Sequence, residues 1–106
     1  MIEIRNCGAK RRQWIDEAES IIGDASDVMD VAEASKSQET AKRKRRRAAK
    51  LYLKAAVLYR QAGLGVMAIS SFEDAADAYA DNGDVDDVTR CEARIAEIET
   101  YLDGEE

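Results

Sequence analysis

The most informative feature of the sequence is a pair of glycine breaks, Gly63 and Gly83, that lie 20 residues apart. They separate three runs, about 47–62, 66–81 and 85–102, in which apolar residues recur every three or four positions. Glycine adopts the left-handed conformation that ends a helix at little cost, so the chain can reverse at each break. Gly65 is expected to help the first reversal. The spacing predicts three short helices, each folded back on the one before it.

The first 46 residues show weaker periodicity. Ile2 and Ile4 alternate with polar residues as in a short strand, although no partner strand is apparent. Residues 9–35 have a helical apolar pattern, which we expect to be broken at Gly23–Ser26. Residues 33–41 have almost no apolar face and are either a loop or an exposed stretch of helix. The N-terminal helical segment is expected to cover the open end of the three later helices.

Composition narrows the class of protein. The 106 residues suit one domain, 1–106, and they include no proline and 45% hydrophobic residues. Abundant alanine and few β-branched residues favour helix. Together with the helical runs, this predicts an all-α fold of four to five helices. The chain opens with no apolar run of signal-peptide or membrane length, so we expect a cytoplasmic protein without a membrane span.

Several site types are disfavoured by residue content. The chain has no histidine, which removes the commonest general base and metal ligand. Cys7 and Cys91 are expected to be free thiols, because two cysteines this far apart form no metal motif. The acidic residues Asp81, Asp84, Asp86 and Asp87 lack the glycine and closing glutamate of a calcium loop. We therefore expect no enzymatic activity, no metal and no cofactor.

The run Ala49–Ala76 resembles a tetratricopeptide repeat. Ala56, Tyr59 and Gly63 stand at that family's small, aromatic and turn positions of the first helix, and Ala68, Phe72 and Ala75 follow at the spacing of the second helix. Tyr52 stands at the place of the usual first aromatic, and the closing proline is absent. A similar pattern restarts 20 residues later, and this overlap is similar to the soluble NSF attachment protein branch of the superfamily. The resemblance spans about residues 47–102 and implies antiparallel helical hairpins in a right-handed stack, with the last helix as a polar cap.

The resemblance also implies a binding face. Ligands of that family lie against the inner face of the first helix, which here contains Lys50, Leu53, Val57 and Arg60. One interpretation is a groove for a partner peptide. The favoured interpretation is that the N-terminal helix, through Trp14, covers Leu53 and Val57.

Charge is distributed unevenly along the chain. The net charge is −6, but residues 1–62 carry 14 basic and 9 acidic side chains, whereas residues 63–106 carry 2 and 13. The basic residues include one unbroken run: Lys42, Arg43, Lys44, Arg45, Arg46 and Arg47. Six consecutive residues cover every face of a helix, and a cationic helix start opposes the helix dipole, which favours a helix beginning earlier, near Gln38.

The basic run has three interpretations. The favoured one is internal neutralisation, because an antiparallel hairpin that turns near Leu64 brings Arg47 level with Asp81 and close to Asp77, Asp84, Asp86 and Asp87. The others are contact with an acidic protein, and contact with the phosphates of nucleic acid or an anionic membrane surface.

The sequence thus favours a small adaptor that binds another protein, or a second copy of itself, through helix faces. The alternatives are a nucleic-acid-associated protein that uses residues 42–47 and a small viral or plasmid protein that inhibits a host factor.

Overall fold

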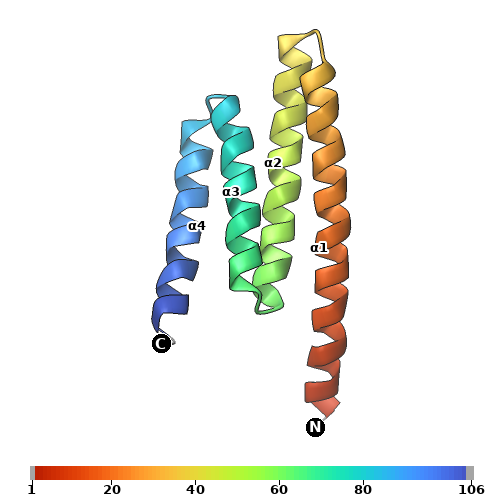
Figure 1. The fold of residues 1–106 in the computed structure, drawn as a ribbon, viewed down its shortest axis with the longest axis vertical. Helices are drawn as coiled ribbons and strands as arrows, with labels where there is room; N and C mark the ends of the chain where they lie inside the picture. The colour runs from red at the N-terminus through yellow and green to blue at the C-terminus, as the bar shows by residue number, and fades with distance from the viewer. Residues whose placement is uncertain (1, 105–106) are drawn as a thin grey trace.

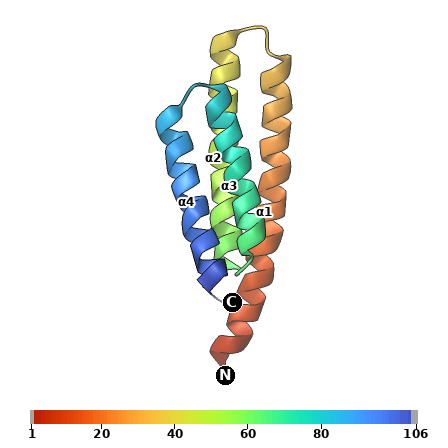
Figure 2. The same ribbon diagram turned by 60° about the vertical axis from the view of Figure 1, so that its left-hand side comes forward.

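The computed structural model describes residues 2–104, with their side chains from Lys10 to Leu102, and this part of the chain is entirely helical. Four helices are present in it: α1 (Ile2–Ala34), α2 (Gln38–Gln61), α3 (Gly65–Asp81) and α4 (Val85–Gly104). They run alternately up and down in a row, and each packs only against its neighbours in the chain (Figures 1 and 2). The result is an elongated, shallow molecule of 54 × 26 × 15 Å. The all-α prediction is confirmed.

The two glycine breaks build the same turn. Gly63 and Gly83 have φ angles of 80° and 76°, in the left-handed region that glycine favours. At the first break the N–H of Leu64 donates to the carbonyl of Tyr59 at 2.9 Å, and at the second the N–H of Asp84 donates to that of Tyr79 at 2.9 Å. These bonds satisfy carbonyls that a helix end leaves unpaired. The predicted glycine stops are confirmed.

Gly65 has a different role from the one expected. It is the first residue of α3 and lies outside the left-handed region. A Cβ at this position would lie 3.2 Å from Leu102 and 3.3 Å from Ile98. The absence of a side chain therefore lets the start of α3 approach the end of α4 closely.

The first helix is longer and more regular than the sequence predicts. α1 is continuous over 33 residues, so residues 2–8 are helical and do not form the strand that was considered, and the break expected at Gly23–Ser26 is wrong. Gly23 and Asp24 are exposed and helical, while Ala18, Ile21, Ala25 and Ala32 are buried along one stripe. Packing of that stripe outweighs the weak local helix preference of the intervening residues.

The second helix begins where the charge argument places it. Ser37 caps α2, because its hydroxyl accepts a hydrogen bond from the N–H of Thr40 at 3.3 Å, and Gln38 is the first helical residue. Residues 35–37 are the connection to α1. At the other end of α2, Arg11 donates from Nε to the carbonyl of Ala62 at 2.8 Å and so ties α1 to this terminus.

The core combines small residues with a few aromatic ones. Buried alanines lie on every one of the first three helices, among them Ala18, Ala56 and Ala75, each fully inaccessible. Because alanine lets helices approach closely, the larger side chains of Tyr59, Phe72 and Tyr79 fill the space beside the contacts. Cys91 is a buried free thiol, as predicted, and the side chain of Cys7 lies outside the described residues.

None of the helices in residues 2–104 combines the length and the apolar character needed to cross a membrane.

Candidate functional site

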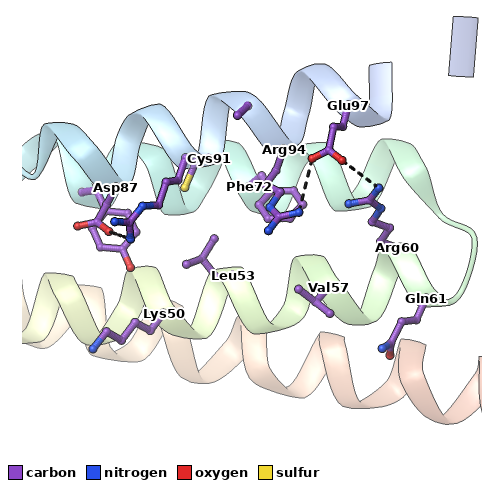
Figure 3. Close-up of a pocket in the computed structure, with 13 residues that line it drawn as sticks. Lys50, Leu53, Val57, Arg60, Gln61, Phe72, Asp87, Cys91, Arg94 and Glu97 are labelled. Atoms are coloured by element: carbon purple, nitrogen blue, oxygen red, sulfur yellow. Dashed lines mark ion pairs between the residues drawn. The ribbon is translucent and has the colours of Figure 1, made fainter. Parts of the chain in front are cut away.

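A groove of about 990 Å³ runs between α2 and α4, with α3 as its floor. Figure 3 shows side chains from α2 and α4 facing each other across it. The groove is lined by thirteen residues: Lys50, Leu53, Val57, Arg60, Gln61, Phe72, Tyr79, Asp87, Arg90, Cys91, Ala93, Arg94 and Glu97. The row arrangement creates this hollow, because α2 and α4 both pack on α3 without packing on each other.

The α2 wall consists of the four residues predicted from the sequence. Lys50, Leu53, Val57 and Arg60 are spaced by three or four positions, so they share one face of the helix, and all four line the groove. Leu53 is half-buried, while Val57 remains 47% exposed. The charged ends of this wall are Lys50 and Arg60, with the two apolar residues between them.

The expectation that the N-terminal helix covers Leu53 and Val57 is wrong. α1 packs on α2 alone, on the side away from the groove (Figure 3), where Ala18 and Ile21 join the core that contains Ala55. Trp14 is only half-buried. The reason is geometric: α1 packs on the side of α2 opposite to the groove, whereas Leu53 and Val57 point into the groove toward α4 (Figure 3).

The floor of the groove is apolar. Phe72 and Tyr79 of α3, with Cys91 at the base of the α4 wall, line it and are each less than 5% exposed. Burial, together with the nearby carboxylates of Asp87 and Glu92, raises the pKa of the Cys91 thiol. The thiol is therefore protonated at neutral pH and behaves as a small apolar group.

The α4 wall is charged, and sequence reasoning missed it. Its cations, Arg90 and Arg94, are the only basic residues in 63–106, and both line the groove. A signal was present, since two arginines four positions apart in an acidic segment must share one helix face. The groove thus has four cations at its rims (Lys50, Arg60, Arg90 and Arg94) and two carboxylates (Asp87 and Glu97).

Three ion pairs order the rim charges. Arg90 pairs with Asp87 at 3.5 Å within α4, and Arg94 pairs with Glu97 at 3.5 Å. Arg60 of α2 reaches Glu97 from the other side at 3.8 Å (Figure 3). The Glu97 carboxylate therefore lies between two arginines and connects the two walls at one end of the groove.

A second, acidic groove of about 700 Å³ lies on the other side of α4, against α3. Its carboxylates are Glu73, Asp74, Asp77, Glu92 and Glu99, and no basic residue is among those that line it. Burial raises the pKa of Asp74, and repulsion from Asp77 and Glu73 raises it further. α4 therefore separates a cation-rimmed groove from an anionic one.

The basic run lies where α2 passes the turn between α3 and α4. Arg46 donates to both carboxylate oxygens of Asp84, at 3.3 Å from Nε and 3.1 Å from Nη2, and this contact lowers the pKa of Asp84. Arg45 donates to the Asn82 side chain at 3.3 Å, and the Asn82 amide donates to the carbonyl of Lys42 at 2.8 Å. These contacts fix the level at which α2 meets the turn.

Fewer residues of the basic run pair with carboxylates than the sequence predicts. Among the ion pairs of the described residues, Arg46 with Asp84 is the only one that involves residues 42–47. Arg47 does not pair with Asp81, and Asp87 pairs with Arg90 instead. Asp84 lies at the turn between α3 and α4, and Arg46 is the residue of the run that lies level with this turn.

Comparison with protein-family models, with curated proteins and with solved structures finds no match to this chain.

Proposed function

We propose that this protein is a protein-interaction module whose helices form a tetratricopeptide-like stack and which binds a partner protein through the groove between α2 and α4. One observation supports this above the others. Val57, at the centre of the α2 wall, is 47% exposed inside a concave, apolar-floored groove. Concave apolar surfaces with a few convergent polar groups are the usual form of binding sites in proteins.

The architecture supports a partner of polypeptide size. The groove is open along its length and is lined by side chains from three helices, which is the form that helix-in-groove recognition uses. The rim arginines are residues enriched at protein interfaces, and Leu53, Val57 and Phe72 offer apolar contact area between them.

The test compares two valine substitutions. Val57→Asp places a carboxylate at the centre of the groove, and Val31→Asp places one on α1, where Val31 is 52% exposed and outside the groove. Affinity capture from cells of the native host, with each variant as bait, should recover the same partner with the wild type and with Val31→Asp but not with Val57→Asp. Equal recovery by all three baits would contradict the proposal, provided that circular dichroism shows equal helix content.

A second candidate function is contact with nucleic acid through residues 42–47. The observation in its favour is that, among the ion pairs of the described residues, only Arg46 in this run has a carboxylate partner. Asp84 at the neighbouring turn, and the net charge of −11 over residues 63–106, oppose the approach of a polyanion.

A further inference from the structure

The Glu97 carboxylate occupies an unusual place in the groove. It lies 3.8 Å from Arg60 of the opposite wall and 3.5 Å from Arg94 of its own helix. These are long ion pairs between solvent-exposed side chains, with exposed fractions of 46% for Arg60, 59% for Arg94 and 54% for Glu97. Pairs of this kind hold their partners weakly, so another carboxylate can take this place at little cost.

The rim of the groove as a whole has an excess of positive charge. Lys50, Arg60, Arg90 and Arg94 face the groove against Asp87 and Glu97, which leaves two cations in excess. The protein as a whole has a net charge of −6, so this groove is a local exception. A segment with carboxylates is therefore attracted to it, whereas a basic segment is attracted to the acidic groove on the other side of α4.

The dimensions and lining of the groove suit a short helix. Residues 50–60 of α2 and 87–97 of α4 form the walls, and eleven helical residues are roughly 16 Å long. The centre of the groove is lined by apolar groups, which offer no hydrogen bonds to a peptide backbone. An extended segment would leave its N–H and C=O groups unpaired there, while a helix satisfies its own.

We infer that the partner segment is an acidic amphipathic helix of about ten residues, whose carboxylate replaces Glu97 between Arg60 and Arg94. This inference rests on the proposed function, since it names the chemistry of the occupant of the same groove. The apolar side chains of the partner helix contact Val57, Leu53 and Phe72. Glu97 then acts as an internal competitor that occupies the arginines until the partner arrives.

The inference is tested with a displayed library of random 15-residue peptides selected on the wild-type protein. The enriched peptides should combine apolar residues at spacings of three and four with aspartate or glutamate beside them. Their affinity should tighten about two- to fivefold with Glu97→Gln and weaken about two- to fivefold with Arg94→Gln. Glu99→Gln is the matched control, because it removes the same charge from the other side of α4 and should leave the affinity unchanged.

The outcomes separate the two proposals. Peptides that lose binding to Val57→Asp but are neutral, basic or without helical spacing would overturn the inference and leave the groove as a binding site. The same holds for acidic peptides whose affinity changes equally with Glu97→Gln and Glu99→Gln. A selection that yields no peptide sensitive to Val57→Asp would overturn both the inference and the proposed function.

Discussion

Small residues determine much of this structure. Gly63 and Gly83 set the ends of α2 and α3, and the lack of a side chain at Gly65 sets how closely α3 approaches α4. Fully buried alanines occupy the positions where helices meet. Gly23, Gly63 and Gly83 all have open space around them, so alanine substitutions at these three positions should have effects whose sign depends on backbone conformation alone.

Gly63→Ala and Gly83→Ala should each lower the free energy of unfolding by about 1 kcal/mol, because an L-residue is strained in the left-handed region. Gly23→Ala should raise it by about 0.5–1 kcal/mol, since Gly23 is exposed within α1 and has open space around it. Urea denaturation measures all three. No added Cβ meets a neighbour within 4 Å at any of these sites, so equal effects at the three positions would contradict the conformational explanation.

Two aspartates should respond oppositely to pH. Asp84 has a pKa lowered by its hydrogen bonds from Arg46, so its stabilising contribution is present above the usual aspartate pKa of about 3.9 and is lost as the pH falls through the native value. Asp74 has a pKa raised by burial and by Asp77 and Glu73, so its charged form is disfavoured in the folded state. That penalty is complete above the native pKa and disappears below about 3.9.

We therefore expect Asp84→Asn to be less stable than the wild type at pH 7 and Asp74→Asn to be more stable. Both differences should vanish when the pH is lowered below the two native values. Thermal unfolding measured from pH 7 to pH 2.5 tests this, with Asp86→Asn, on the exposed first turn of α4, as the control. A stabilising Asp84→Asn at pH 7 would show that the Arg46 contact does not favour folding.

At the scale of the elements, close approach between helices depends on alanine. Ala75 is fully buried on α3 in the core cluster that also contains Ala49 of α2 and Cys91 of α4. The helix therefore has no space for a larger residue at this position, whereas Ala80, five residues further along, is exposed.

Ala75→Leu should lower the free energy of unfolding by about 1–3 kcal/mol, because three extra carbons must be forced into a packed contact. Ala80→Leu introduces the same side chain on the same helix and should change stability little. Chemical denaturation of the two variants provides the comparison. If both behave alike, α3 does not pack on its neighbours in the way described.

At the scale of the whole molecule, charge is separated in space as well as along the chain. The basic run of α2 lies beside the turn between α3 and α4. Arg90 and Arg94, the basic residues of the C-terminal half, line the groove between α2 and α4, whereas five carboxylates line the groove on the other side of α4. A partner of the kind proposed above would meet surfaces of opposite sign on the two sides of α4, and this difference would fix its orientation.

Two triple substitutions test what the basic run does. Replacing Arg45, Arg46 and Arg47 with Gln removes the contacts to Asn82 and Asp84 and should lower the melting temperature modestly, while partner capture through the groove stays intact. Replacing Arg43, Lys44 and Arg47 with Gln removes the same charge but keeps those contacts, so the melting temperature should not change.

Measuring the nucleic-acid binding of the same two variants distinguishes the two candidate functions of the protein. If the run contacts phosphates, both triple variants should lose affinity for duplex DNA or RNA, and the slope of log affinity against log salt should flatten by about one unit per lost contact. We expect weak binding by all three proteins. Sub-micromolar binding at physiological salt that both triple variants abolish would reverse the ranking of the two candidate functions.

Features that depend on neighbours within one helical turn follow directly from the amino-acid sequence. The apolar spacing of three and four placed α2, α3 and α4, and glycine placed the ends of α2 and α3, because these choices are made by local conformational preference. The face of α2 with Lys50, Leu53, Val57 and Arg60 was also evident, since periodicity shows which residues of one helix lie together.

The packing of the helices against one another establishes which of their faces meet. It made α1 continuous through Gly23, placed α1 on the side of α2 that leaves Val57 exposed, and brought Arg94 and Glu97 opposite Arg60. It also selected Arg46, out of six consecutive cations, as the partner of Asp84. These outcomes depend on the register between segments about 40 residues apart, which is set by the fit of buried side chains between helices, and a periodic pattern within one helix contains no information about that fit.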